Sequence, residues 1–111
     1  MKIIKLYGGL GNQMFQYAFA CALEAASADE VRFDGSVADT DAAHNGLELD
    51  RVFGLQLPTA SRHDCMRLSV PANGFLNRLR RKYLTKPTHC IDRAFGYQPE
   101  LLTLPGDRYY E

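Results

Sequence analysis

The sequence predicts an α/β protein whose doubly wound parallel sheet begins at the amino terminus. An apolar, β-branched run at 2–7 is followed by a glycine-rich turn, and then by a long apolar segment with helical spacing. A second short strand is predicted at 30–34, which gives the order strand, glycine loop, helix, strand. Strands joined in this way lie parallel, with a right-handed crossover. The 111 residues suffice for one such domain.

The first helix is predicted to begin at Asn12 or Gln13 and to run to about Ala28. Apolar side chains cover most of its circumference, so we expect it to be buried on more than one side. Its aromatic residues are expected in the core rather than in a sugar-binding surface. These aromatic residues are Phe15, Tyr17 and Phe19.

The rest of the chain predicts shorter elements. A polar loop is expected over 35–46, and apolar positions at i, i+3 and i+4 predict a short helix over 48–53. Ser61 with Asp64 three residues later resembles a capping box and predicts another helix, which Pro71 stops. The remaining elements are an amphipathic helix at 75–83, a strand at 89–91, a short helix at 99–104 and an extended run at 107–111.

Charge is balanced overall but unevenly distributed. The formal net charge is zero, so no general attraction to nucleic acid is implied. Residues 1–60 hold four Lys or Arg against eight Asp or Glu, whereas residues 61–111 hold nine against five. The basic residues cluster at 78–86, where they form either the solvated face of a helix or a surface that contacts an anionic membrane.

Cys21, Cys65 and Cys90 are widely spaced and odd in number. No CxxC pair or Cys/His cluster suggests a metal site, so we expect three free, mostly buried thiols that serve packing. Such thiols fit a reducing cytoplasm. No signal-peptide pattern and no membrane-spanning run is found, so we expect a cytoplasmic protein, with peripheral contact at the inner membrane face as a further option.

The glycine-rich turn over 8–11 is the strongest candidate for a ligand site. Glycine allows a sharp turn and close approach of a ligand, and a helix that begins there presents N–H groups and a positive dipole to an anion. A plain turn between strand and helix is the simplest alternative. A dinucleotide fingerprint fails because Met14 occupies its third glycine position, and no Gly-Lys-Ser/Thr of a Walker A loop follows. The carboxamides of Asn12 and Gln13 favour a phosphate or sugar ligand.

Three segments resemble the bacterial and animal α-1,2-fucosyltransferases. GGLGNQMFQYAFA at 8–20 is similar to the amino-terminal signature of that family, and HNGLELDRVF at 44–53 is similar to a second family segment. A third resemblance lies in YQPELL at 97–102 with DRYYE at 107–111. The resemblance implies a Rossmann-like N-terminal half of a GT-B-type glycosyltransferase, truncated before its donor-binding C-terminal domain, so that 1–111 is an incomplete α/β domain.

The same resemblance implies the substrates and the site. The co-substrate is GDP-fucose, the acceptor is a galactose-terminated glycan, and no metal or other cofactor is expected. Donor contacts are implied for Gly9, Gly11, Asn12 and Gln13. A further substrate contact is implied for His44 and Asn45.

Catalysis by this chain alone is not expected. The family's His-x-Arg-x-Gly-Asp motif, which neutralises the departing diphosphate, does not occur in the sequence. Glu48 and Asp50 are candidates for a base, although carboxylates on an amphipathic helix usually face solvent. A non-catalytic or decayed fragment, and a small nucleotide-binding module of unrelated activity, remain as alternatives.

Overall fold

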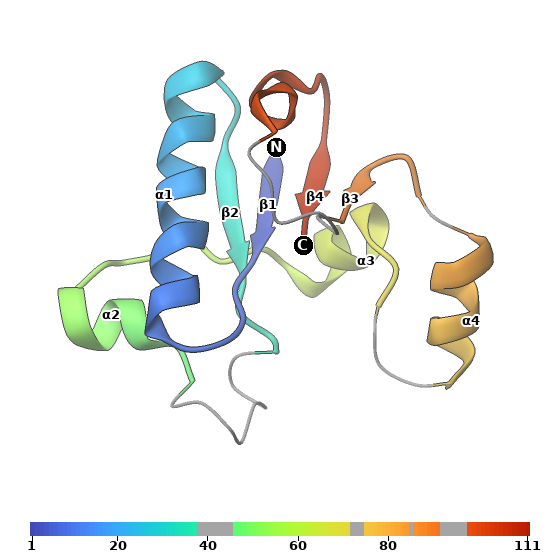
Figure 1. Ribbon diagram of the computed structural model, residues 1–111, viewed down its shortest axis with the longest axis horizontal. Helices are drawn as coiled ribbons and strands as arrows, with labels where there is room; N and C mark the ends of the chain where they lie inside the picture. Colours follow the sequence, from blue (N-terminus) through green and yellow to red (C-terminus); the bar gives the residue numbers. More distant parts are fainter. Residues whose placement is uncertain (38–45, 72–74, 85, 92–97) are drawn as a thin grey trace.

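The computed structural model describes residues 1–37, 46–71, 75–84, 86–91 and 98–111 (Figure 1). In chain order the elements are β1 (Lys2–Lys5), α1 (Leu10–Ala26), β2 (Val31–Asp34), α2 (Glu48–Phe53), α3 (Arg62–Leu68), α4 (Phe75–Tyr83), β3 (His89–Cys90), the 3₁₀ helix η2 (Pro99–Thr103) and β4 (Arg108–Tyr110).

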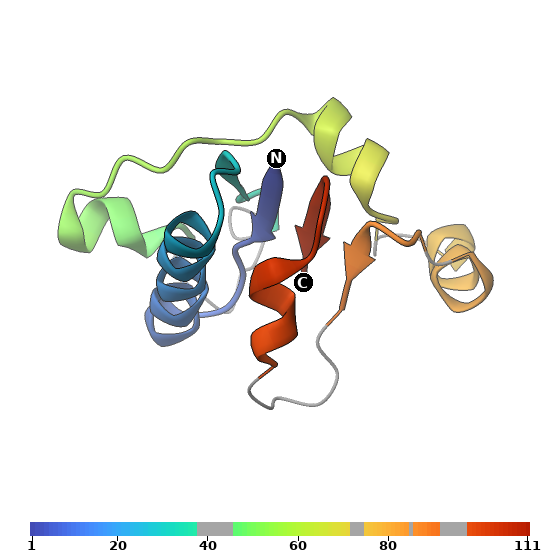
Figure 2. The same ribbon diagram turned by 90° about the horizontal axis from the view of Figure 1, so that it is seen from above.

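The four strands form one parallel sheet with helices on both faces. The strand order is β2-β1-β4-β3, and every neighbouring pair is parallel. Helix α1 and η2 lie on one face and α3 lies on the other, as the view from above shows (Figure 2). The α/β class and the parallel sheet predicted from the sequence are confirmed, and the arrangement is compatible with a Rossmann-like fold.

The direction of chain winding reverses beside β1. From β1 the chain first places β2 on one side, and later places β4 and β3 on the other. In open α/β sheets such a reversal leaves a crevice at the carboxyl ends of the strands, where ligands commonly bind. Lys5 ends β1 and Glu111 follows β4, so these two residues mark this position.

The hydrophobic core has one cluster on each face of the sheet. On the α1 face, Tyr17 stacks on Phe33 with ring centroids 6.2 Å apart, and Phe19 meets Tyr110 edge to face at 5.2 Å. Tyr17 and Phe19 are partly buried and pack against the core, so their predicted positions are confirmed in part. The α3-face cluster is smaller and consists of Ile3, Leu68 and Tyr109 with Met1, Ala60 and Cys65 packed against it.

The burial predicted for α1 is wrong in part. The helix contributes few buried side chains, and Phe15 is 80% exposed. The reason is that the sheet covers one side of the helix, so apolar residues elsewhere on its circumference face solvent. Cys21 is likewise exposed rather than buried, whereas Cys65 and Cys90 are partly buried.

Local sequence signals predicted the start of α3 and both ends of α2, but not the start of α1. The Oγ of Ser61 accepts a hydrogen bond from the backbone N–H of Asp64 at 3.1 Å, which confirms the predicted cap of α3. Helix α2 has its predicted bounds and ends at Gly54, which adopts a left-handed conformation. Helix α1 begins at Leu10, two to three residues earlier than predicted, because Gly9 takes the N-cap position.

Candidate functional site

The glycine turn lies at the carboxyl edge of the sheet, between β1 and α1, at the lower edge of the sheet in Figure 1. Gly8 has a φ of 75°, a conformation that favours glycine. A Cβ atom there would also lie 2.5 Å from Nδ2 of Asn12. Gly8, rather than Gly9 or Gly11, is therefore the position at which the backbone itself requires glycine.

The amino terminus of α1 is exposed at Gly11 and Asn12, whereas Gly9 and Leu10 are partly buried. Gly9 is the N-cap, and no described side chain caps the helix. The first turn holds no acidic residue, so its positive end is not compensated locally. Gly11 and Asn12 are exposed, and a Cβ atom on Gly11 would have no neighbour within 4 Å. This end of α1 has the geometry and the charge to receive an anion.

Gln13 is buried and joins two segments of the chain. Its Nε2 donates to the carbonyl oxygens of Gly8 at 2.9 Å and Gly46 at 2.8 Å. Its Oε1 accepts from the backbone N–H of Glu48 at 2.9 Å. Both N–H donors of the amide are therefore occupied by the protein. Gln13 holds the glycine turn against the start of α2, a structural role.

The other residues singled out from the sequence have different surroundings. His44 and Asn45 lie outside the described residues, although the next residue, Gly46, is held beside the glycine turn by Gln13.

The two candidate bases lie on α2. Glu48 is buried, and its carboxylate accepts from Nη2 of Arg51 at 3.0 Å. Asp50 is exposed on α2. Of the two candidate bases, Glu48 therefore forms an ion pair with another residue of α2.

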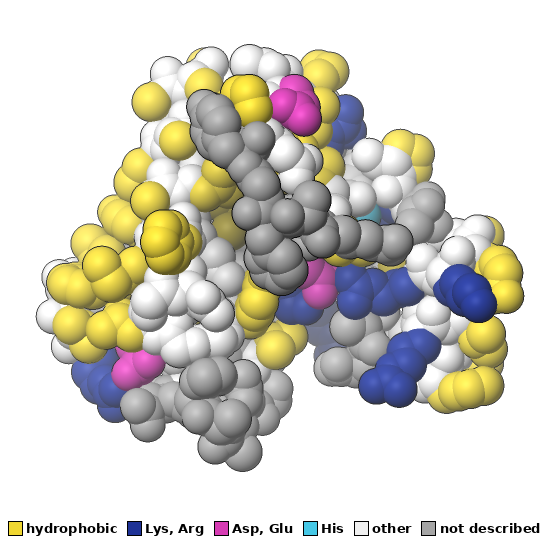
Figure 3. All heavy atoms as spheres, in the orientation of Figure 1, with side chains coloured by type: hydrophobic (Ala, Val, Ile, Leu, Met, Phe, Trp, Pro, Cys, Tyr) yellow, Lys and Arg dark blue, Asp and Glu magenta, His cyan; other side chains and the backbone are white. Residues whose placement is uncertain are grey.

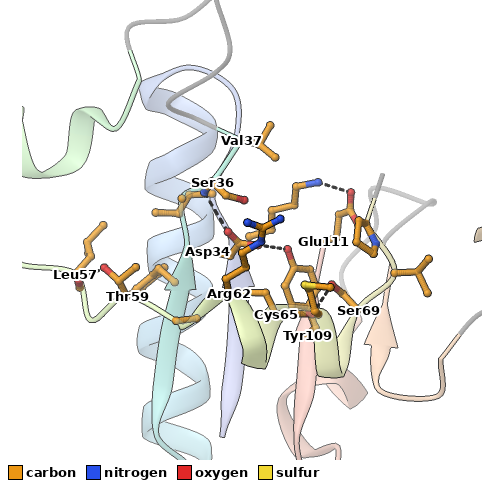
Figure 4. Close-up of a pocket in the computed structure, with 18 of the residues that line it drawn as sticks. Asp34, Ser36, Val37, Leu57, Thr59, Arg62, Cys65, Ser69, Tyr109 and Glu111 are labelled. Atoms are coloured by element: carbon orange, nitrogen blue, oxygen red, sulfur yellow. Dashed lines mark hydrogen bonds and ion pairs between the residues drawn. The ribbon is translucent and has the colours of Figure 1, made fainter. Parts of the chain in front are cut away.

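A cavity of about 840 Å³ opens on the α3 face at the carboxyl ends of β1, β2 and β4 (Figure 4). Its polar walls come from the strand ends and from α3, and include Asp34, Ser36, Arg62, Tyr109 and Glu111. A second, largely apolar cavity of about 670 Å³ lies between α1 and η2. Lys5 and Glu111 line both cavities, which places them at the winding reversal.

Asp34 is the centre of a hydrogen-bonded cluster in the larger cavity. It accepts from the hydroxyl of Tyr109 at 2.6 Å and from the backbone N–H of Ser36 at 3.0 Å. Burial alone would raise the pKa of Asp34, but these hydrogen bonds outweigh it and lower the pKa. Burial and the nearby carboxylate raise the pKa of the Cys65 thiol to about 12. Asp34 is thus a charged hydrogen-bond acceptor that joins Tyr109 and Ser36, and it is a weak base.

We expect Tyr109→Phe to reduce the free energy of unfolding by roughly 1.5–3 kcal/mol, because Asp34 loses a donor to its buried charge. The pKa of Asp34 should rise towards its ordinary value, so the variant should lose less stability than the parent on acidification. Urea unfolding at several pH values measures both effects. Tyr110→Phe is the matched control: its hydroxyl donates to the neutral carbonyl of Leu101, and its effect should be smaller.

Glu111 is surrounded by three cationic or donor side chains. Its carboxylate accepts from Nζ of Lys5 at 2.6 Å, from Nε2 of His89 at 2.9 Å and from Arg81. Nδ1 of His89 accepts from the backbone N–H of Val70, which assigns the ring proton to Nε2. Burial opposes the charged form, but the hydrogen bonds from His89 and Lys5 and the nearby charges lower the pKa of Glu111 to about 2.

Sequence reasoning did not identify these two carboxylate clusters. Their members come from β1, β2, α3, α4, β3 and β4, so no local spacing links them. One feature of the sequence could have indicated them: Asp34 and Glu111 come at the ends of short apolar strands, and the carboxyl ends of parallel strands lie at one edge of a sheet. Glu111, like Asp34, is a poor proton acceptor near neutral pH because its pKa is low.

Comparisons with models of protein families, with curated proteins and with solved structures found no match to this chain. In the part of the chain that the structure describes, no three His, Cys, Asp or Glu residues are grouped so that they could hold a metal ion. Within the same ranges, every helix is too short or too polar to cross a bilayer.

Proposed function

We propose that the chain is the N-terminal part of an α-1,2-fucosyltransferase of the GT-B type. The intact enzyme transfers L-fucose from GDP-fucose to the 2-hydroxyl of a terminal galactose on a glycan. One observation carries the proposal: two of the three segments that resemble this family lie together in their described residues. Gln13, in the first, hydrogen bonds to Gly46 and Glu48 in the second, at the start of α1.

The chemistry of a nucleotide-sugar donor suits this end of α1. The diphosphate of GDP-fucose approaches the first-turn N–H groups, where the glycine at 11 leaves room for it. Asn12 donates from its amide to a phosphate or sugar oxygen. The acceptor hydroxyl attacks the anomeric carbon from the opposite face as GDP departs. Most of the stabilisation of the leaving group comes from a C-terminal half, which carries the basic motif of the family.

Gly11→Ala distinguishes a donor-binding site from a turn that only joins the strand to the helix. Alanine should stabilise α1 by roughly 0.5–1 kcal/mol, because the new Cβ meets no neighbour and glycine is costly inside a helix. If a diphosphate binds there, the same methyl obstructs it and raises the Kd for GDP-fucose about tenfold, which is about 1.4 kcal/mol. Thermal unfolding measures the change in stability, and calorimetric titration with GDP-fucose measures the change in Kd.

Asn12→Ala should weaken GDP-fucose binding without a comparable loss of stability, since the Asn12 side chain is exposed. Gln56→Ala, an exposed carboxamide between α2 and α3, is the matched control and should leave binding unchanged. A plain turn would show the stabilisation by Gly11→Ala with unaltered donor affinity in both loop variants, and would overturn the site assignment.

The activity itself is tested on the protein encoded by the complete reading frame. Fucosyl transfer from GDP-fucose to galactosides, with the linkage determined on the product, is expected. Donor binding without transfer would favour the alternative of a non-catalytic fragment. Thermal stabilisation by NAD or ATP in place of GDP-fucose would favour an unrelated nucleotide-binding module.

A further inference from the structure

Helix α4 is amphipathic, and its apolar side is turned away from the protein. The helix contributes no buried residue. Phe75 is 77% exposed, Leu76 75% and Tyr83 70%, and Leu79 lies on the same side at 41%. In Figures 1 and 2 the helix stands beyond β3 at the edge of the molecule. These four side chains, which we call the α4 apolar stripe, form a continuous surface at i, i+1, i+4 and i+8 spacing.

The opposite side of α4 is the one that faces the body of the protein. Arg81 is bonded to the carboxylate of Glu111, and Asn77 lines the larger cavity. At about 100° per residue, positions 77 and 81 lie across the helix from the apolar stripe. The packing is therefore the reverse of an ordinary surface helix, which buries its apolar side. The ion pair at Glu111 holds this orientation.

Basic side chains border the apolar stripe. Arg80 lies on one side of it, and Arg78 and Lys82 lie on the other, by the same helical geometry. Nζ of Lys82 is 5.5 Å from the ring centroid of Tyr83. Residues 65–91 hold six Lys or Arg and no Asp or Glu. Figure 3 shows hydrophobic side chains along the outer margin of this region, with Lys and Arg side chains next to them.

We propose that α4 docks on an anionic lipid surface, with the apolar stripe in the interface and the three flanking cations at the phosphate level. A helix with an apolar stripe between basic flanks lies in the plane of such a surface. Each cation near an anionic membrane strengthens the attraction, by roughly fivefold in partitioning. A second copy of the chain is a poorer occupant, because pairing two α4 helices would set cations against cations. The proposal does not depend on the proposed function.

Vesicle flotation tests it, with the protein encoded by the complete reading frame and with the 111-residue chain beside it; binding only by the 111-residue chain, and not by the complete protein, would overturn the proposal. The protein should float with vesicles of phosphatidylcholine mixed with phosphatidylglycerol in equal parts, and much less with phosphatidylcholine alone. Added salt should weaken binding, because it screens the cations. Flotation also separates bound protein from aggregates, which sediment.

Two sets of variants test the two parts of the surface. Arg80→Gln with Lys82→Gln should lower partitioning onto the anionic vesicles about 20- to 30-fold. Phe75→Ser with Leu76→Ser should lower it at least about tenfold, because the apolar contribution is lost. All four residues are exposed, so the fold should be retained, which circular dichroism checks.

The matched controls lie elsewhere on the molecule. Phe15→Ser removes an equally exposed phenylalanine from α1, and Arg51→Gln with Arg62→Gln removes the same charge from α2 and α3. Both should leave partitioning unchanged. Failure to bind anionic vesicles, equal binding to neutral vesicles, or equal loss in the controls would overturn the proposal. So would self-association without lipid that is abolished by Phe75→Ser with Leu76→Ser.

Discussion

Replacing Gln13 by leucine is expected to lower the free energy of unfolding by at least roughly 3 kcal/mol, since three backbone groups each lose a buried partner. Leucine fills much of the volume of glutamine but offers no hydrogen bond. The carbonyls of Gly8 and Gly46 and the N–H of Glu48 then have no donor or acceptor from position 13. Urea unfolding at neutral pH, followed by circular dichroism, measures the change.

Gln16→Leu is the matched control for this experiment. Gln16 also bonds to the loop backbone, at Tyr7, but its contacts of 3.2 and 3.4 Å are longer and exposed. Its loss should cost less than about 1 kcal/mol. Equal effects of the two leucine variants would contradict a bridging role for Gln13. Gln13→Glu should be destabilising as well, because its carboxylate would face two carbonyl oxygens.

Stability is expected to fall steeply on acidification, chiefly through Glu111. The pKa of this carboxyl is about 2 in the folded protein, against 4.5 ordinarily. A lowered pKa means that the stabilisation is fully present above pH 4.5 and is lost as the pH falls towards 2. The difference corresponds to roughly 3 kcal/mol. Urea unfolding across this range should show the decline.

Glu111→Gln should remove most of that pH dependence and lower stability at neutral pH. The glutamine leaves Lys5 and Arg81 without their counter-charge, and both are only partly exposed. Glu100→Gln, an exposed change in η2, is the control and should leave the acid profile as it is. Asp34 retains its own lowered pKa, so a smaller acid dependence should persist in the Glu111 variant. An unchanged profile in Glu111→Gln would contradict the assignment.

Much of the fold could be predicted because its signals are local. The cap of α3 depends on residues three positions apart, and the end of α2 depends on Gly54 alone. The parallel pairing of β1 and β2 followed from the order of strand, glycine turn and helix, since a helical crossover joins strands that run in the same direction. Each of these features is decided by residues that are close in the chain.

The candidate site could be predicted only in part. The glycine turn between the first strand and the first helix was anticipated, but the buried bridge by Gln13 was not. A carboxamide suits a ligand and a backbone carbonyl equally, so its chemistry alone does not choose between them. The exposure of Phe15 could not be predicted either, because the sequence of a helix that is apolar on most sides does not indicate which side the sheet covers.

The amino-acid sequence alone determined the order of elements, their caps and the conformation of the glycine turn, because hydrogen bonds and backbone sterics over a few residues decide them. The tertiary structure decided which polar groups meet. Lys5 and Glu111 are 106 positions apart, yet parallel pairing of β1 and β4 brings them to one edge of the sheet. Both side chains are partly buried, and each neutralises the charge of the other, a condition that exists only once the strands are paired.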